Sequence, residues 1–395
     1  MFAKTYLATA VSLLEKYTGN EPFHLYLKKY YGVFKKFGSR DRKAITQLCY
    51  CWFRAGHALA HLQKDQQVIY ALFICSDGET KLLQELDARL NSEAAKPLEE
   101  KLKIAEAEVG FQRQHLFPWQ TLLSPEIEPH LFNQSMLVQP HVYLRLRPGK
   151  EGVVTTTLRD NNIAFEKISN HCLSISNSTK ADAVLQLDKD AVVQDLNSQR
   201  VLELINEHGV LKKINPERAE GFTAWDCCAA SGGKSLLLAD TFSKAHITAS
   251  DVRASILHNL RNRFQRAGIN QYRWFVGDAT KDAPPQQVKF DLIICDAPCS
   301  GSGTWSRTPE QLHYFNPDKI NAYAQLQKSI LNNVSHYLKP GGLLLYATCS
   351  VFKKENEDVI EFASKNGRLH FLKSAYYTGY DKRADTLFAA LFKAL

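Results

Sequence analysis

Apolar and polar positions follow three different periods along the chain, and each period predicts a different kind of structure. Residues 1 to about 130 carry helical periodicity, and Ser39-Arg40-Asp41-Arg42 is typical of a helix start with Ser39 as its cap. Between residues 138 and 200 the pattern changes to short β-like segments, of which Val142–Arg147 alternates as a strand does. From about residue 220, strand-like and helix-like segments alternate, which predicts a mostly parallel sheet with helices on both faces.

The alternating region contains the predicted strands and helices in order. Its strand candidates are Phe222–Trp225, Ile247–Ser250, Arg273–Val276, Asp291–Cys295 and Leu343–Ala347. Its helix candidates are Lys234–Phe242, Ala254–Arg266 and Asp318–Leu338, and Pro340-Gly341-Gly342 stops the last of them. We therefore predict an α/β domain over residues 206–395, preceded by a helical domain over residues 1–130 and a small α+β module over residues 131–205.

Chain length and cysteine content narrow the class of protein. The chain has 395 residues, which is too long for one ordinary core. Its nine cysteines are an odd number and follow no secretory signal, so we expect free thiols in a reducing compartment, the cytoplasm. We interpret Cys227, Cys228 and Cys295 as small buried side chains, and without a Cys-x-x-Cys pair we expect no metal. No uncharged apolar stretch can span a bilayer, so we expect no membrane partner.

Positive charge is concentrated near the N-terminus. Residues 1–66 contain eleven Lys and Arg against four Asp and Glu, which accounts for nearly all of the net charge of +8. A localised basic excess is typical of proteins that bind phosphate backbones, although a solvated helical surface is the alternative interpretation. We expect Arg145, Arg147 and Lys150 to contact phosphates as well, and Tyr314 and Phe315 are candidates for stacking on a base.

A glycine-rich turn between the first predicted strand and its helix indicates a cofactor loop. The loop residues are Ala229, Ala230, Ser231, Gly232, Gly233 and Lys234. Glycine allows the backbone to approach a ligand closely, and ligands bind beyond the carboxyl ends of parallel strands. A phosphate-binding loop of the Walker type is excluded, because Cys228 occupies the position where that motif needs glycine.

Two acidic residues end the next two predicted strands. Asp251 suits two ribose hydroxyls, since a carboxylate can accept both hydrogen bonds, and Asp278 could accept from an adenine amino group. The alternative for each is a helix cap or a surface charge. Their repetition at successive strand ends favours the cofactor interpretation.

Two further cysteines lie in distinct motifs, each directly after an apolar strand-like run. Cys299 belongs to Asp296-Ala297-Pro298-Cys299-Ser300-Gly301, and Cys349 belongs to Thr348-Cys349-Ser350. Two thiols beside a cofactor loop predict covalent chemistry with separate attacking and releasing groups. On mechanism alone, either cysteine could attack.

These residues resemble the RsmB-type branch of the Nop/Sun family of RNA cytosine-5 methyltransferases. The family loop Asp-x-Cys-Ala-Ala-Pro-Gly-Gly-Lys matches residues 226–234, with Ser231 in place of proline. The family motifs Asp-x-Pro-Cys-Ser-Gly and Thr-Cys-Ser match residues 296–301 and 348–350. Residues 193–199 are similar to the segment before the family's catalytic domain, and residues 385–392 are similar to its terminal strand hairpin.

The resemblance implies a Rossmann-like class I methyltransferase domain with a mostly parallel seven-stranded sheet. It implies S-adenosylmethionine as cofactor, bound by the loop from Ala229 to Lys234 with Asp251, Asp278 and Asp296. It also implies an RNA substrate, often ribosomal RNA, whose cytosine is methylated on carbon 5. The basic N-terminal part is similar to the helical NusB-type RNA-binding domain of this branch, and we expect the protein to be a monomer.

The resemblance also assigns roles to the two cysteines. In the RNA family the Thr-Cys-Ser cysteine attacks carbon 6, which favours Cys349 as nucleophile and Cys299 as the group that assists release. Asp296 would contact ring nitrogen 3 or the exocyclic amine, and Lys234 is a plausible cation near the thiols. The target base must be unpaired or flipped.

Three alternatives stay open. One is an RNA-binding ribosome-assembly factor with weak or lost catalysis, which Ser231 and Ile256 motivate because both depart from the family pattern. Another is a tRNA cytosine-5 methyltransferase. A DNA cytosine methyltransferase is disfavoured by the basic N-terminal helices and by the Thr-Cys-Ser motif.

Overall fold

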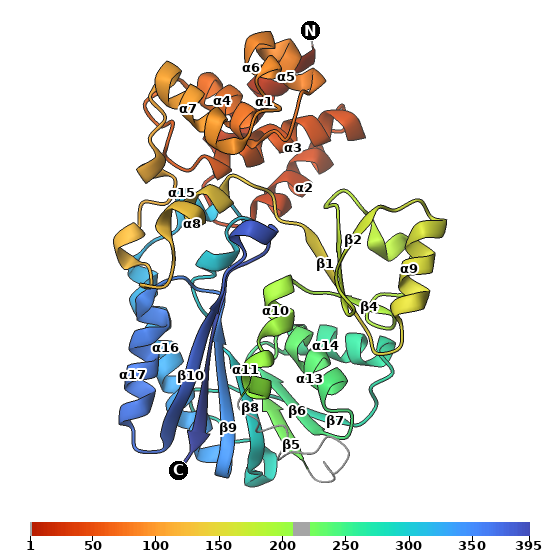
Figure 1. Cartoon of the computed structure of the whole chain (residues 1–395), viewed down its shortest axis with the longest axis vertical. Helices are drawn as coiled ribbons and strands as arrows, with labels where there is room; N and C mark the ends of the chain where they lie inside the picture. The colour runs from red at the N-terminus through yellow and green to blue at the C-terminus, as the bar shows by residue number, and fades with distance from the viewer. Residues whose placement is uncertain (1, 208–221) are drawn as a thin grey trace. The chain divides into compact units, whose positions relative to one another are not determined.

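The computed structural model describes residues 2–207 and 222–395, which form two compact units (Figure 1). The helical unit comprises Met1–Thr121, Glu128–Gln139 and Thr304–Pro317. The α/β unit comprises Leu122–Ile127, Pro140–Gly303 and Asp318–Leu395. Each unit therefore contains segments that are far apart in the sequence.

The helical unit is built from short amphipathic helices around an aromatic core. The helices are α1 (Phe2–Lys16), α2 (Phe23–Val33), α3 (Ser39–Arg54), α4 (Lys64–Cys75), α5 (Lys81–Leu86), α6 (Ala88–Ser92), α7 (Leu98–Val109), α8 (Pro129–Met136) and α15 (Gln311–Tyr314). Phe23 and Phe53 are fully buried, with ring centroids 4.8 Å apart, and Tyr17 lies against both. Edge-to-face aromatic packing of this kind stabilises the core beyond simple burial of area.

The start of α3 differs from the prediction by one residue. Gly38 is the cap, and Ser39 is already helical. The Asp41 carboxylate accepts a hydrogen bond of 2.8 Å from the Gly38 backbone N–H, which satisfies a donor at the helix start. Asp41, and not Ser39 as predicted, therefore makes the side-chain hydrogen bond that stabilises the start of the helix.

The segment Thr304–Pro317 belongs to the helical unit although the sequence placed it in the α/β domain. Tyr314 donates a hydrogen bond of 2.8 Å to the Tyr17 carbonyl, and Glu310 accepts from the Phe23 backbone N–H at 3.2 Å. The imidazole of His313 stacks on the Trp52 indole with centroids 4.1 Å apart. The predicted boundaries at residues 130 and 205 also differ from the two units, since the small α+β module is grouped with the large sheet.

The small module contains a four-stranded antiparallel sheet in the order β2-β3-β1-β4. Its elements are β1 (Val142–Leu146), α9 (Glu151–Asp160), β2 (Phe165–Ser169), β3 (Cys172–Ile175) and β4 (Ala191–Val193), followed by the short helices α10 (Leu196–Arg200) and α11 (Glu203–Glu207). Leu144 and Leu173 pair across the sheet and pack with Val154 and Leu158 of α9. The alternation in Val142–Arg147 therefore correctly predicted a strand.

The large sheet has seven strands in the order β10-β11-β9-β8-β5-β6-β7. The strands are β5 (Thr223–Asp226), β6 (His246–Asp251), β7 (Tyr272–Val276), β8 (Phe290–Asp296), β9 (Leu338–Thr348), β10 (Leu369–Tyr377) and β11 (Leu387–Ala394). The pairs among β5 to β9 are parallel, and β10 and β11 form the antiparallel end. This confirms the predicted Rossmann-like α/β fold.

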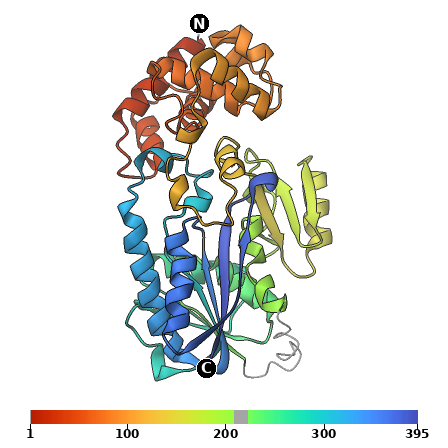
Figure 2. The ribbon, with the colours of Figure 1, turned by 60° about the vertical axis from the view of Figure 1, so that its left-hand side comes forward.

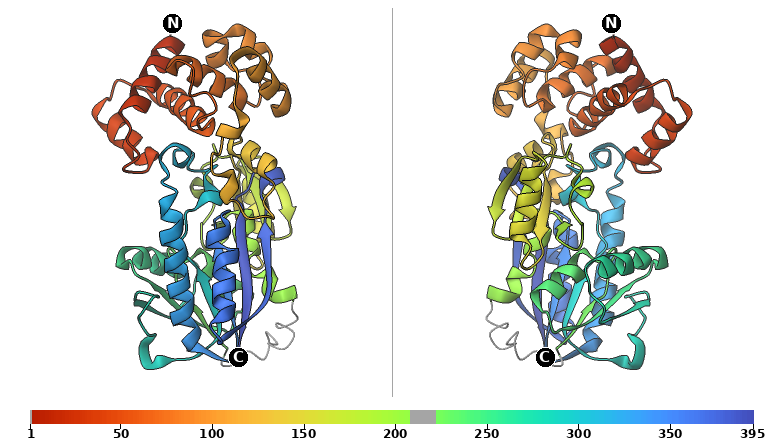
Figure 3. Two further views of the ribbon diagram at one scale, coloured as in Figure 1. Left: turned by 90° about the vertical axis from the view of Figure 1, so that its left-hand side faces the viewer. Right: turned by 90° about the vertical axis from the view of Figure 1, so that its right-hand side faces the viewer.

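Helices cover both faces of this sheet (Figures 2 and 3). On one face lie α16 (Asp318–Val334) and α17 (Glu357–Lys365), and on the other lie α13 (Gly233–Thr241) and α14 (Ala254–Arg266). Ile330 and Val359 of the first pair share a core with Trp225, whereas Leu238 of α13 packs on the opposite face with Ile247. Within residues 2–207 and 222–395, no helix combines the length and apolar character that a bilayer crossing requires.

Candidate active site

The predicted site residues lie where the parallel strands end. Strands β5, β6, β8 and β9 end at Asp226, Asp251, Asp296 and Thr348. The chain runs outward from β5 through β6 to β7 and then continues in β8 on the other side of β5. Such a reversal of strand order lies at the carboxyl ends of β5 and β8, and α/β sheets bind their ligands at such points.

The two motif cysteines lie side by side. The Sγ atoms of Cys299 and Cys349 are 3.3 Å apart, although 50 residues separate them in the chain. Both side chains are half-buried. The Ala297 and Gly303 backbone N–H groups donate to the carbonyls of Ala347 and Cys349, at 2.9 and 2.8 Å, so the two loops are joined on either side of the sulfurs.

The environment of Cys299 favours its protonated form. The hydrogen bond to Cys349 and burial both raise the pKa of the Cys299 thiol well above its ordinary value. Cys299 therefore keeps its proton near neutral pH.

A buried ion pair lies beside the cysteines. Lys234, at the start of α13, places Nζ 2.5 Å from the Asp296 carboxylate, and the lysine side chain is only 10% exposed. Burial on its own would lower the pKa of the Lys234 ammonium, but Asp296 outweighs it and raises that pKa, with a smaller contribution from Cys349. The lysine therefore remains charged, which places a cation near the Cys349 sulfur.

A buried carboxylate that the sequence did not single out connects both cysteine loops. Glu355 is fully buried and accepts hydrogen bonds from the Ser300 backbone N–H at 2.8 Å and from the Ser300 hydroxyl at 2.6 Å. Its other hydroxyl partner is Ser350, at 2.5 Å. Ser300 follows Cys299 and Ser350 follows Cys349, so one carboxylate determines the position of both loops.

Asn356 completes the support of the second loop. Its side-chain amide accepts from the Thr348 hydroxyl at 2.6 Å and donates to the Ser350 carbonyl at 2.9 Å. Thr348 and Ser350 flank Cys349, which fixes the backbone on both sides of that sulfur. The available sequence signal was an acid and an amide six and seven residues after the cysteine, directly before a helix.

The cofactor loop has the backbone geometry that its glycines predicted. Gly232 adopts φ = 85°, and a Cβ atom there would lie 2.8 Å from the Leu260 side chain, so only glycine fits. The Ala230 backbone N–H donates to the Asp251 carboxylate at 3.0 Å, and the Ala229 N–H donates to the Ser250 carbonyl at 2.9 Å. The loop is thereby joined to the end of β6.

The two acidic residues at the strand ends differ in their surroundings. The buried Asp251 accepts from the Arg253 backbone and side chain at 2.9 and 3.0 Å, and its oxygens retain lone pairs for further donors. Asp278 is half-buried, and hydrogen bonds from the hydroxyl and backbone N–H of Thr280 lower its pKa. Neighbouring donors therefore hold both carboxylates in position.

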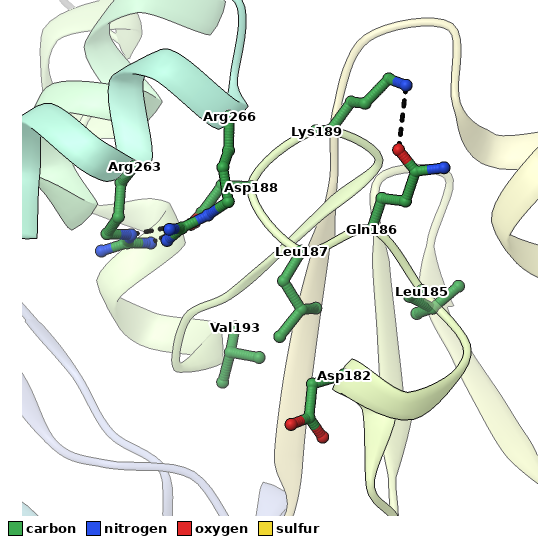
Figure 4. A pocket seen from close by; sticks show the side chains of 9 residues that line it. All are labelled: Asp182, Leu185, Gln186, Leu187, Asp188, Lys189, Val193, Arg263 and Arg266. Carbon is green, nitrogen blue, oxygen red and sulfur yellow. Dashed lines mark hydrogen bonds and ion pairs between the residues drawn. The ribbon is translucent and has the colours of Figure 1, made fainter.

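Ser231, which replaces the family proline, is stabilised by an arginine from α14. The Arg263 guanidinium donates to the Ser231 carbonyl at 3.1 Å and to its hydroxyl at 3.3 Å. Figure 4 shows Arg263 and Arg266 both directed at Asp188, with pairs of 2.8 and 2.6 Å, beside a cavity of about 720 Å³. Asp188 belongs to the small module and is buried, so that module fixes the arginine that holds the cofactor loop.

Several predicted RNA contacts have other partners in the structure. Arg145 is buried and forms an ion pair with Asp240, and Arg147 pairs with the same carboxylate at 2.8 Å. These two arginines therefore stabilise the contact between the small module and α13, and the prediction that they contact phosphates is wrong. Lys150 is 37% exposed, with Nζ 3.7 Å from Asp190.

The predicted stacking residues also pack inside the helical unit. The Tyr314 ring lies edge-on to Tyr17 with centroids 5.1 Å apart. Phe315 packs against Trp119 and Trp305, with centroids 5.4 and 4.7 Å away. These contacts assign both rings to the core of that unit rather than to a base.

A family model and the curated relatives that match this chain carry the same description. A sequence model described as 16S rRNA methyltransferase RsmB/F matches residues 212–383. The ribosomal RNA small subunit methyltransferase B of Pasteurella multocida is 35% identical over 234 residues, which cover 56% of this chain and 50% of that protein. The probable ribosomal RNA small subunit methyltransferase B of Bacillus subtilis is 33% identical over 153 residues, which cover 38% of this chain and 34% of that protein. The chain thus spans half or less of the length of these curated relatives.

Solved structures share the fold. The crystal structure of PH0851 has a TM-score of 0.65 at 20% identity and covers 92% of this chain and 93% of its own. A methyltransferase homologue from Pyrococcus horikoshii has a TM-score of 0.57 at 20% identity, covering 74% of this chain and 98% of its own. NSun6 from Pyrococcus horikoshii, solved with the S-adenosylmethionine analogue SFG, has a TM-score of 0.52 at 17% identity, covering 65% and 91%. The predicted RsmB-type resemblance and the predicted S-adenosylmethionine cofactor are confirmed at the level of the family.

The contact between Arg263 and Ser231 leads to a prediction about cofactor affinity. We expect Arg263→Ala to weaken S-adenosylmethionine binding about tenfold, since it removes two hydrogen bonds to the loop, together worth about 1.4 kcal/mol. Adding Ser231→Pro should restore most of the affinity, because proline restricts the same backbone. Titration calorimetry measures each dissociation constant.

Arg266→Ala is the matched control, since Arg266 contacts Asp188 but makes no hydrogen bond to the loop among the described residues. An equal loss in the control, or no recovery with proline, would contradict the assignment.

Proposed function

We propose that this protein transfers a methyl group from S-adenosylmethionine to carbon 5 of a cytosine in ribosomal RNA, because residues 212–383 match the sequence model described as 16S rRNA methyltransferase RsmB/F. The reaction passes through a covalent bond between Cys349 and carbon 6. The observation that carries this proposal is the 3.3 Å separation of the Cys299 and Cys349 sulfurs beside the Lys234–Asp296 ion pair. We further propose that the enzyme acts as a monomer in the cytoplasm.

The cofactor would lie at the carboxyl ends of β5 and β8, where the strand order reverses. The loop from Ala229 to Lys234 would lie along the methionine part, while Asp251 would accept from the ribose hydroxyls and Asp278 from the adenine amino group. Asp296, at the end of β8, would lie between the cofactor and the target base. Each of these residues follows or ends a parallel strand, which supports a single extended binding site.

The first chemical step needs a thiolate. Carbon 5 of cytosine is a poor nucleophile until a sulfur adds to carbon 6 and breaks the conjugation of the ring. An ordinary cysteine is only about 3% ionised at pH 7. The buried Lys234 ammonium stabilises negative charge on the Cys349 sulfur, and Asp296 would hydrogen-bond the exocyclic amine or nitrogen 3 as the ring accepts electrons.

The later steps release the Cys349 sulfur from carbon 6. Carbon 5 would then take the methyl group from the cofactor and lose its proton to water, while the bond between carbon 6 and Cys349 breaks and the aromatic ring is restored. The Cys299 sulfur lies next to the bond that must break, and its raised pKa keeps it protonated, so that it can donate a hydrogen bond to the departing Cys349 sulfur. We therefore propose that Cys349 attacks and Cys299 assists release.

The basic surface of the helical unit supports RNA binding. Lys28 on α2 and Lys35 and Lys36 after its end are exposed, and the exposed Phe34 lies between them in the sequence. Arg54 does not belong to this surface, since it is buried and donates to the Met136 and Val138 carbonyls. A cluster of cations with an exposed aromatic ring suits phosphates and an unpaired base.

Replacing the nucleophile tests the reaction. Cys349→Ala should abolish transfer of labelled methyl groups to ribosomal RNA, because it removes the proposed nucleophile. The variant should still bind S-adenosylmethionine in a calorimeter. Methyl transfer at the normal rate would reject the assignment. A wild-type protein that binds RNA but neither binds the cofactor nor transfers methyl groups would instead indicate the ribosome-assembly factor.

Replacing the second cysteine tests release. Cys299→Ala should accumulate a covalent complex between protein and RNA that survives denaturing electrophoresis, because the enzyme forms the sulfur–carbon bond but breaks it slowly. The double variant Cys299→Ala/Cys349→Ala is the control and should form no complex. Unimpaired methylation without any trapped complex would remove Cys299 from the release step.

Neutralising the basic surface tests RNA binding. Lys28→Gln/Lys35→Gln/Lys36→Gln should weaken RNA binding and reduce the slope of log affinity against log salt by about 2, since each lost phosphate contact to single-stranded RNA removes about 0.7. Filter binding at several salt concentrations measures the slope. Lys81→Gln/Lys96→Gln/Lys103→Gln removes the same charge from other exposed positions of the unit and should leave the slope unchanged. Equal slopes for the two variants would contradict a localised RNA surface.

A further inference from the structure

Three cysteines outside the proposed catalytic pair converge beneath the cofactor loop. The sulfurs of Cys227, Cys228 and Cys295 all lie within 4.8 Å of one another. Cys295 belongs to β8, and Cys227 follows β5 and donates its backbone N–H to the Ile294 carbonyl at 3.0 Å. The sequence indicated only small buried side chains, because the spacing of these cysteines matches no metal-binding motif. Pairing of the two adjacent parallel strands brings them together.

The separation of the sulfurs suits a single soft metal ion. A bond of about 2.3 Å from zinc to each sulfur places the sulfurs of a three-coordinate site about 4 Å apart. Small rotations of the side chains would bring the three sulfurs to that spacing, with no change of backbone. Thiolates are soft ligands that select ions such as Zn²⁺, Cd²⁺ and Cu⁺ over Mg²⁺ or Ca²⁺.

The three cysteines differ in burial, and the least buried one offers a metal ion a way in. Cys227 and Cys295 are almost completely buried in the core that contains Trp225 and Ile293. Cys228 is half-buried and directly precedes Ala229 of the cofactor loop. An ion could therefore reach Cys228 first and then bind the two inner sulfurs.

All three thiols would lose their protons to solvent as their bonds to the ion form.

We propose that Cys227, Cys228 and Cys295 form a binding site for one soft, thiophilic metal ion of the zinc group. The bound ion would connect the end of β5 to β8 directly beneath the cofactor loop. The site does not depend on the proposed methyl transfer, because none of its sulfurs takes part in that reaction. Binding would stabilise the folded α/β unit by mass action, as any ligand specific to the folded state does.

Cadmium provides a direct probe, because each bond between cadmium and a thiolate absorbs in the ultraviolet. The full chain with Cys299→Ala/Cys349→Ala is titrated with Cd²⁺ under reducing conditions, so that the catalytic pair cannot bind the ion. We expect one equivalent to bind, with sulfur-to-cadmium absorption and a higher unfolding temperature. Zn²⁺ should displace Cd²⁺ and remove the absorption.

Variants identify the sulfurs. Cys228→Ser and Cys295→Ala, each in the same background, should lose at least tenfold in Cd²⁺ affinity, and circular dichroism checks that each variant is folded. Cys51→Ser/Cys75→Ser removes two thiols of the helical unit and is the matched control, which should bind Cd²⁺ as the background does. Absence of a one-equivalent transition in the background protein, or unchanged affinity in the folded Cys228→Ser variant, would overturn the proposal. Methyl transfer is not the readout, so failure here is distinguishable from failure of the proposed function.

Discussion

The candidate site depends on one buried carboxylate. Glu355 accepts hydrogen bonds from the residues that directly follow Cys299 and Cys349, and so determines how far apart the two sulfurs lie. Burial raises the pKa of the Glu355 carboxyl, while the serine donors oppose that change. A carboxylate removed from water is stable only when donors surround it, and here the donors are the two loops themselves. The contacts that stabilise Glu355 are therefore the contacts that order the reactive pair.

Much of the α/β unit could be predicted from the sequence because its elements are locally encoded. Runs such as Leu292–Cys295 are buried on both faces of a parallel sheet, so they are continuously apolar, and glycine marks the turn at Gly232. The placement of Thr304–Pro317 could not be predicted in this way. Its helix is four residues long, too short for a periodic signal, and its contacts to Tyr17 and Phe23 span almost 300 residues of sequence. Tertiary packing decides such a segment.

The same distinction applies to the site. Motif residues such as Cys349 and Lys234 were identifiable because their chemistry is specific, and the strand ends bring them together. Charged residues were predicted less well, since Arg145 and Arg147 look like RNA contacts until their shared partner Asp240 is known. Composition counts a cation but cannot show whether a carboxylate far along the chain neutralises it. Arg263 is the converse case, because an unremarkable helical arginine stabilises the loop where Ser231 replaces proline.

A second buried acid, Asp226, affects how the charge of Lys234 is balanced. Burial raises the pKa of Asp226 to about 7, a change that its hydrogen bond from Ser235 only partly opposes. The other oxygen of this carboxyl is buried and has no hydrogen-bond partner among the described residues, which suits a protonated acid better than an anion. Below that pH, Asp226 contributes no charge, and Asp296 alone balances the Lys234 ammonium. If Asp226 were ionised, a second carboxylate would share that cation. The low polarity around β5 therefore does more than support the fold, since it keeps Asp226 from competing with Asp296 for the Lys234 ammonium.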